Sequence, residues 1–212
     1  MTNLARETIG RLIEEASWTE RAKSLERLAA RYAEGGLDAA EWREANDAFR
    51  VVLYDAEPLV RRVLAETVKF VPDLPRDILL ALARDQATVA TPILEQSRLL
   101  GDEDLLPIVE RHSAGHRLAV AGRRALSPRV AAALCRHGDR AAILRLLDND
   151  GAAIGEGALH GLLDRFTEDR AVTDAIARRR LLPRSVAMRL SGPSQPPANS
   201  PGASWSRTGS LG

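Results

Sequence analysis

Helix-length apolar patterns recur along the chain, and this repetition restricts the possible folds more than any other feature. After Asp55, the apolar residues Val60, Leu64 and Val68 fall on one face of a helix with 3.6 residues per turn. A similar segment begins thirty residues later, at Asp85. Because fixed periods of this length are typical of repeat architectures, the sequence predicts a chain built from similar helical units.

Further helices are predicted between and after these two segments. Weaker copies of the same pattern begin at His116 and Asp139. Partner helices are predicted after Pro75, Pro128 and Pro183, because proline is well tolerated in the first helical turn, where its missing N–H would be unpaired anyway. The resulting unit has two short helices, spans about 25–30 residues and recurs about five times.

Each predicted helix has one apolar face, and stacking neighbouring units buries these faces in a continuous core. The sequence therefore predicts an all-α solenoid of about five stacked helix pairs over residues 45–190. Residues 1–44 are predicted to form N-terminal helices that pack on the solenoid as a cap. Residues 191–212 are rich in Ser, Pro and Gly, and this composition predicts a disordered tail.

The order and spacing of short motifs along residues 20–190 resemble an uncharacterised family of HEAT-like repeat proteins from alphaproteobacteria, which carries a domain-of-unknown-function label. The motifs are Val60-Arg61, Leu64-Ala65-Glu66, Leu74-Pro75, Leu82-Ala83, Val89-Ala90, His116-Arg117-Leu118-Ala119, Leu126-Ser127 and Gly138-Asp139. The resemblance implies an α-solenoid in a cytoplasmic bacterial protein. It implies no activity and no catalytic residues.

Composition narrows the function classes further. The chain has 30 basic and 29 acidic residues, a net charge of +1 and only 4% aromatic residues. A balance this even creates no global field that would attract nucleic acid or an acidic membrane, so both partners are disfavoured. The sequence shows no signal peptide, and no apolar run reaches the ~18 residues that a transmembrane helix needs. We therefore predict a cytoplasmic location and no membrane insertion.

Five polar residues at similar places in the repeats are predicted to form a structural ladder. They are Asp55, Arg61, Asp85, His116 and Arg123. In the favoured interpretation, each Asp caps a helix start and each Arg binds a neighbouring turn or carboxylate. The alternative is a row of polar groups that binds a partner along one face.

Four other residues are candidates for partner binding. Trp18 and Trp42 are conspicuous in a chain so poor in aromatics, and tryptophan is enriched at binding hot spots. Packing of the N-terminal helices is the alternative role for both. Arg62 and Arg124 belong to short basic pairs that would suit contacts with carboxylate or phosphate groups, although mixed-charge helix faces also explain such pairs.

No metal or cofactor site is predicted. His112 and His116 are four residues apart, as in helical zinc sites, but the intervening Gly115 predicts a break between two helices. Cys135 is the only cysteine, which excludes an intrachain disulfide and a multi-cysteine metal site. The neighbouring Arg136 would favour a lowered thiol pKa, whereas the interpretation as a buried structural cysteine predicts an inert thiol.

The sequence contains no recognisable catalytic constellation, phosphate loop or dinucleotide fingerprint. We therefore predict a non-enzymatic module or scaffold for protein–protein interaction, with an unidentified protein partner and an undetermined oligomeric state. The alternative is a HEAT-like nucleic-acid-binding protein, including a base-excision DNA glycosylase with a basic concave groove. A third hypothesis is an accessory protein, such as a chaperone or lyase for a prosthetic group, which would need a deep apolar pocket.

Overall fold

The computed structural model describes residues 10, 14 and 17–192, and within this part the chain is helical throughout, with one isolated β-bridge between Leu126 and Ala152. The helices are α2 (Trp18–Glu34), α3 (Ala39–Val52), α4 (Pro58–Val68), α5 (Arg76–Arg84), α6 (Ala87–Gln96), α7 (Asp102–Arg111), α8 (Ala114–Ala121), α9 (Pro128–His137), α10 (Arg140–Leu147), α11 (Glu156–Arg165), α12 (Arg170–Ala177) and α13 (Arg184–Leu190).

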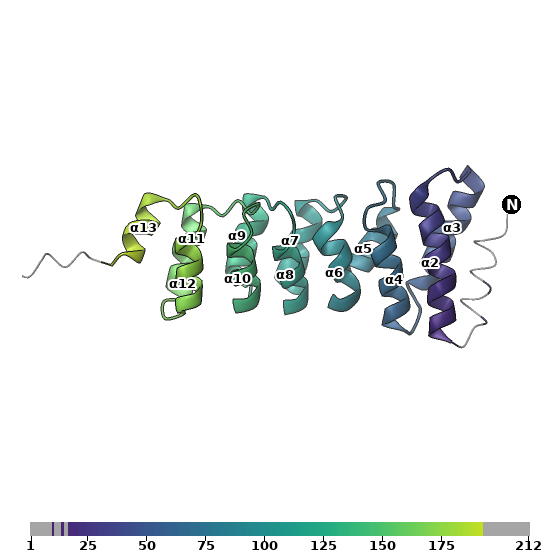
Figure 1. Ribbon diagram of the computed structural model, residues 1–212, viewed down its shortest axis with the longest axis horizontal. Helices are drawn as coiled ribbons and strands as arrows, with labels where there is room; N and C mark the ends of the chain where they lie inside the picture. The colour runs from purple at the N-terminus through teal and green to yellow at the C-terminus, as the bar shows by residue number, and fades with distance from the viewer. Residues whose placement is uncertain (1–9, 11–13, 15–16, 193–212) are drawn as a thin grey trace, which may run out of the picture.

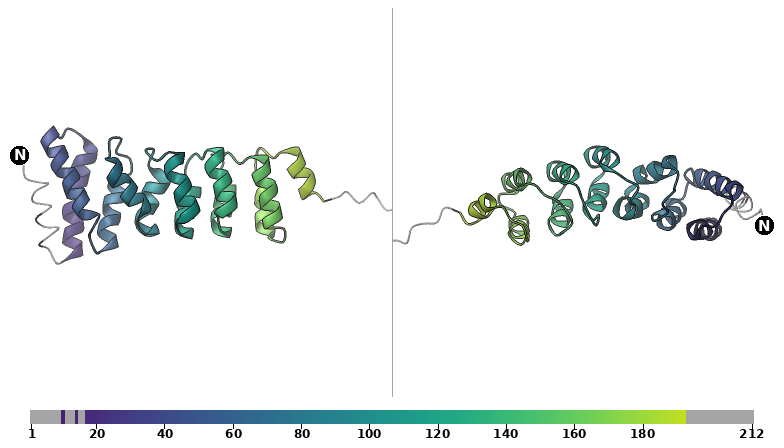
Figure 2. Two further views of the ribbon diagram at one scale, coloured as in Figure 1. Left: turned by 180° about the vertical axis from the view of Figure 1, so that it is seen from behind. Right: turned by 90° about the horizontal axis from the view of Figure 1, so that it is seen from above.

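These helices form an elongated stack with two layers (Figure 1). The even layer consists of α2, α4, α6, α8, α10 and α12, and each of these helices packs on the next member of the layer. The odd layer consists of α3, α5, α7, α9, α11 and α13. Figure 2, seen from above, shows the two layers side by side and a shallow bend that places the even layer on the inner side.

The helices begin where local sequence signals favour a helix start. Asp38 accepts hydrogen bonds from the amides of Ala40 and Glu41, and its own amide donates to the Glu41 carboxylate, which completes a capping box at the start of α3. Ser127 caps α9, in which Pro128 is the first residue. Pro75 lies one position earlier than predicted for a first-turn proline, at the N-cap of α5.

The apolar faces meet in one continuous core between the two layers. Every helix contributes buried side chains to the fold, and the largest fully buried ones include Phe49, Leu64, Leu82, Leu134 and Ile143. Burial of each such side chain contributes about 1.5–3 kcal/mol relative to exposure. The core therefore joins each unit to both of its neighbours, as the repeating apolar pattern requires.

The predicted boundary at residue 44 is wrong, because it falls inside α3, which continues to Val52. The connection between the first two helix pairs is the segment 53–57. Moreover, α2 packs on α4 in the same way that α4 packs on α6, so α2 and α3 occupy the position of a further helix pair. The prediction of a disordered tail lies outside the described residues beyond Gly192.

The connection between α7 and α8 also differs from the expectation. The helix break falls at His112 and Ser113, whereas Gly115 lies within the first turn of α8. A Cβ atom at Gly115 would lie 2.6 Å from the Cβ of Ala87 in α6. The glycine is therefore needed for the close approach of two helices rather than for a break. In the part of the chain that is described, no helix is both long and apolar enough to cross a membrane.

Candidate partner-binding surface

Arg61 of α4 links the turn that precedes α4 to the turn that precedes α6 through its guanidinium. It makes two hydrogen bonds with the carboxylate of Asp85, at 2.6 and 2.8 Å, and it also donates to the backbone carbonyl of Asp55 at 2.6 Å. The side chains of Arg61 and Asp85 are each only 15% exposed. This bidentate geometry orients both partners and is shielded from water, so it fixes the start of α4 against the start of α6.

Asp55 has an equivalent partner, Arg21, which was not predicted from the sequence. Arg21 binds the carboxylate of Asp55 with two hydrogen bonds, at 2.8 and 3.0 Å. Neither aspartate is the N-cap residue of the following helix, because those positions are held by Glu57 and Gln86. Instead, the carboxylate of Asp55 accepts a hydrogen bond from the backbone amide of Glu57, and that of Asp85 accepts one from the amide of Gln86. Each aspartate thus orders the turn that leads into an even-layer helix.

Burial and hydrogen bonding act in opposite directions on these carboxyl groups. Burial favours the neutral form and raises the pKa of Asp85, but the hydrogen bonds from Arg61 and from the Gln86 amide outweigh it. The pKa of Asp85 therefore lies below its ordinary value, and the same balance, with Arg21 as the donor, lowers the pKa of Asp55. Both side chains are charged at neutral pH.

His116 is held by hydrogen bonds at both ring nitrogens. Its Nε2 donates to the backbone carbonyl of Asp85 at 2.7 Å, and its Nδ1 lies 2.8 Å from the hydroxyl of Ser113, from which it accepts in the neutral ring. The ring of His112 lies 5.0 Å away, centroid to centroid. Among the described residues, no three His, Cys, Asp or Glu side chains are grouped so that they could hold a metal ion.

We expect the free energy of unfolding to fall as the pH drops below 6.5, the ordinary pKa of histidine. Burial lowers the pKa of His116, the positive charges of nearby His112 and Arg117 lower it further, and Asp85 opposes them. On acidification the unfolded chain therefore takes up a proton on this histidine before the folded chain does. The stability that neutral His116 contributes is fully present above pH 6.5 and declines below it. Urea unfolding on either side of pH 6.5 measures this decline.

The matched variant for this prediction is His116→Gln, whose amide can still donate to the carbonyl of Asp85. The decline between neutral pH and about pH 5.5 should be smaller in this variant than in the unsubstituted chain. An equal decline in both proteins would show that another group is responsible.

A series of side chains connects the ends of the even-layer helices. Arg123, Asn149 and Arg179 each lie two residues beyond the end of their own helix, namely α8, α10 and α12. Each donates hydrogen bonds to carbonyls at the end of the preceding even-layer helix, which have no partner within that helix. The accepting carbonyls are those of Leu94 and Ser97 for Arg123, Ala121 and Arg123 for Asn149, and Leu147, Asn149 and Ala152 for Arg179.

The position two residues beyond the helix end is occupied differently after α4 and α6. There the residues are Phe70 and Arg98, and both are exposed. The side chain of Phe70 is 69% exposed, with the Lys69 ammonium 5.2 Å from the centre of its ring. Arg98 makes no hydrogen bond or ion pair with any described residue. Neither residue was predicted from the sequence as part of a site.

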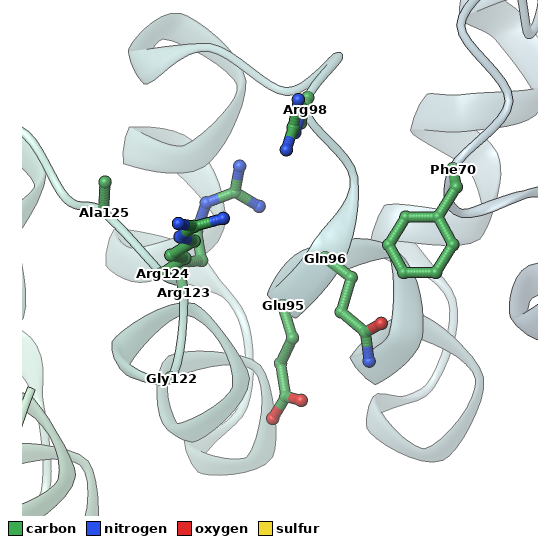
Figure 3. A pocket seen from close by; sticks show the side chains of 8 residues that line it. All are labelled: Phe70, Glu95, Gln96, Arg98, Gly122, Arg123, Arg124 and Ala125. Atoms are coloured by element: carbon green, nitrogen blue, oxygen red, sulfur yellow. The ribbon is translucent and has the colours of Figure 1, made fainter. Parts of the chain in front are cut away.

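Phe70 and Arg98 line a hollow of about 640 Å³ at the ends of α4, α6 and α8. Figure 3 shows Phe70 on one side of this hollow, Arg123 and Arg124 on the other, and Arg98 between them. We call this site the arginine hollow. The remaining lining residues are Glu95, Gln96, Gly122 and Ala125.

The arginine hollow has an excess of positive charge. Glu95 is its one acidic lining residue, and it is bound by Arg145 of α10 at 2.7 Å. The guanidinium of Arg123 is half-buried and bonded to neutral carbonyls only, and burial lowers its pKa. Arg124 is exposed and, like Arg98, has no ionic or hydrogen-bonding partner in the described part of the chain. This arrangement suits an anionic group that enters from solvent.

The four predicted partner-binding residues do not form one surface. Trp18 and Trp42 belong to α2 and α3 and are 43% and 37% exposed, and Trp42 stacks on Tyr32 with a centroid distance of 6.2 Å. Arg62 belongs to α4 and lies 3.6 Å from the carboxylate of Glu66 in the same helix. Of the four, Arg124 alone lines the arginine hollow.

Cys135 lies at a second hollow, of about 820 Å³, between α7, α9 and α11 of the odd layer. Its thiol is buried, and burial raises its pKa to about 12 despite the positive charges of Arg165 and Arg179. The thiol therefore stays protonated at neutral pH, contrary to the lowered pKa considered from its neighbour Arg136. Arg165 itself donates to the carbonyls of Cys135 and Gly138 at the end of α9.

Residues 89–192 match the model of a family described as an uncharacterised protein conserved in bacteria (DUF2336). This finding agrees with the bacterial family of unknown function in the sequence resemblance. The matched segment includes Arg98, Arg123 and Arg124, whereas Phe70 precedes it. Neither the curated proteins nor the solved structures include a significant match to the chain.

Proposed function

We propose that the chain is a HEAT-like α-solenoid that acts as a non-enzymatic interaction module and binds another protein in the cytoplasm. The observation that carries the proposal is the arginine hollow. Arg123, Asn149 and Arg179 at the even-layer helix ends are bonded within the stack, whereas the side chains of Arg98 and Arg124 in the hollow make no hydrogen bond or ion pair with a described residue. Exposed, unpaired guanidinium groups beside an exposed aromatic ring are typical of a binding surface.

The arrangement also favours a protein partner over nucleic acid. Duplex or single-stranded nucleic acid is held through many phosphate contacts along a continuous basic surface. On the same edge of the stack, the end of α10 carries the exposed acidic residues Asp148 and Asp150. These acidic residues interrupt the basic surface between the arginine hollow and the exposed Arg178 and Arg180 that follow α12. Glu95, which a glycosylase mechanism would need as a free carboxylate, is bound by Arg145.

Affinity capture with the full-length chain tests this proposal. The tagged protein is incubated with extract of the source cells, with and without nuclease, and the bound material is identified by mass spectrometry. We expect a protein that survives nuclease treatment and forms a stoichiometric complex with the purified chain in analytical ultracentrifugation. Loss of all bound protein after nuclease treatment, together with direct binding of a purified oligonucleotide, would contradict the proposal and support the nucleic-acid alternative.

A further inference from the structure

The charge of the arginine hollow specifies the chemistry of the group that it binds. Arg98, Arg123 and Arg124 line it, and none of the three has a carboxylate partner among the described residues. The one lining carboxylate, on Glu95, is neutralised by Arg145. The local excess of three positive charges is unusual in a chain whose net charge is +1. A ligand that brings two or more negative charges would compensate it.

The excess positive charge of the hollow depends on Gly122, which has no side chain. Arg145 belongs to α10, and it reaches past α8 to bind Glu95 in α6. A Cβ atom at Gly122 would overlap the guanidinium of Arg145. Gly122 therefore leaves the path open by which Arg145 neutralises Glu95. The same contact keeps Glu95 from pairing with Arg98 or Arg124, which remain available to a ligand.

The opposite wall of the hollow adds an apolar contact. The side chain of Phe70 is 69% exposed, and Figure 3 shows its ring beside Gln96 at one side of the hollow. A ligand with charged groups alone would leave this ring in water. A ligand with an apolar side chain next to its charges would cover the ring and gain hydrophobic stabilisation.

We infer that the arginine hollow binds an acidic peptide segment of the partner protein, with its carboxylates on Arg98 and Arg124 and an adjacent apolar side chain against Phe70. This inference rests on the proposed function, because it assumes that the partner is a protein. Guanidinium groups bind carboxylates in a bidentate manner, and Arg123 adds positive charge at the wall without direct pairing. The exposed Asp148 and Asp150 at the end of α10 interrupt the basic surface, which favours a short segment of polypeptide over a nucleic-acid backbone.

The inference is tested with short fluorescent peptides and the full-length chain. One peptide alternates glutamate with leucine, the second has glutamine in place of each glutamate, and a fluorescent single-stranded oligonucleotide is the third probe. We expect fluorescence anisotropy at low salt to show that the glutamate peptide binds about tenfold more tightly than the glutamine peptide. Equal binding of the two peptides, or tighter binding of the oligonucleotide, would overturn the inference.

Charge reversal locates the binding site. The double variant Arg98→Glu/Arg124→Glu should weaken binding of the glutamate peptide by about tenfold or more. The matched control is Arg84→Glu/Arg111→Glu, which changes the net charge equally at exposed positions at the ends of α5 and α7. Its effect should stay within about threefold. Equal weakening by both variants would show a general charge effect and would overturn the assignment to this hollow.

The same variants separate this inference from the proposed function. If the Arg98→Glu/Arg124→Glu chain still captures the nuclease-resistant protein partner as well as the unsubstituted chain does, the partner binds elsewhere. The inference then fails while the proposed function stands. Circular dichroism and urea unfolding of both double variants should match the unsubstituted chain, because all four side chains are exposed and make no hydrogen bond or ion pair with a described residue.

Discussion

The Gly151→Ala variant should lose about 3 kcal/mol of unfolding free energy, because a new Cβ atom has no room. That atom would overlap the backbone carbonyl oxygen of Arg124. Here Leu126 donates from its amide to the carbonyl of Gly151 at 3.1 Å, and Ala153 donates to the carbonyl of Leu126 at 3.1 Å. Since the two nearest obstructing atoms belong to the backbone of Arg124, no side-chain rotation relieves the clash. Urea unfolding measures the loss.

Gly161→Ala is the matched control. Gly161 lies within α11, and a Cβ atom there would meet nothing within 4 Å. Since alanine favours the helix over glycine, this variant should be about 0.5–1 kcal/mol more stable than the unsubstituted chain. Opposite signs for the two substitutions are therefore expected. If Gly151→Ala were as stable as the unsubstituted chain, the contact between the segments 124–126 and 151–153 would have to be looser than described.

Asp85→Ala is expected to reduce the unfolding free energy by about 3 kcal/mol. The substitution leaves the guanidinium of Arg61 without a carboxylate in a place where its side chain is only 15% exposed. It also removes the acceptor for the amide of Gln86, which precedes α6. Thermal or urea unfolding tests the size of this effect.

A double-substitution cycle isolates the contribution of the pair. Adding Arg61→Met to Asp85→Ala removes the unpaired charge, so the double variant should be more stable than the sum of the two single losses predicts, by about 1–2 kcal/mol. The exposed pair of Arg129 and Glu103, with side chains 63% and 79% exposed, provides the comparison. Glu103→Ala should change stability by less than about 0.5 kcal/mol. If Asp85→Ala and Glu103→Ala reduced the unfolding free energy equally, burial would not be what makes the Arg61–Asp85 pair the more important one.

The sequence was sufficient to predict those helices whose starts have local signals. Pro128 follows a capping serine, Asp139 caps α10, and apolar residues at helical spacing define the buried face of each helix. The end of α3 was misplaced because no glycine or proline follows it until Pro58. A helix without a terminal signal leaves its boundary undefined in the sequence.

The partners of the ladder residues were less predictable. Arg21 binds Asp55 across 34 residues, and this contact depends on how α2 stacks on α4. Of the residues that line the arginine hollow, Arg123 was predicted as a ladder residue and Arg124 as a partner-binding residue. Phe70 and Arg98 were missed, because they are recognised by their position two residues beyond a helix end. Phe70 and Arg98 occupy this position only when the ends of α4 and α6 are known to a single residue. Sequence patterns define helix ends less closely than that.

Hydrogen–deuterium exchange of the full-length chain, alone and with its purified captured protein, tests whether a protein partner binds at the even-layer helix ends. We expect binding to slow exchange in the segments 69–75, 97–101 and 122–127, which follow α4, α6 and α8. Unchanged exchange in these three segments, with protection confined to α7, α9 and α11 around the second hollow, would contradict this expectation.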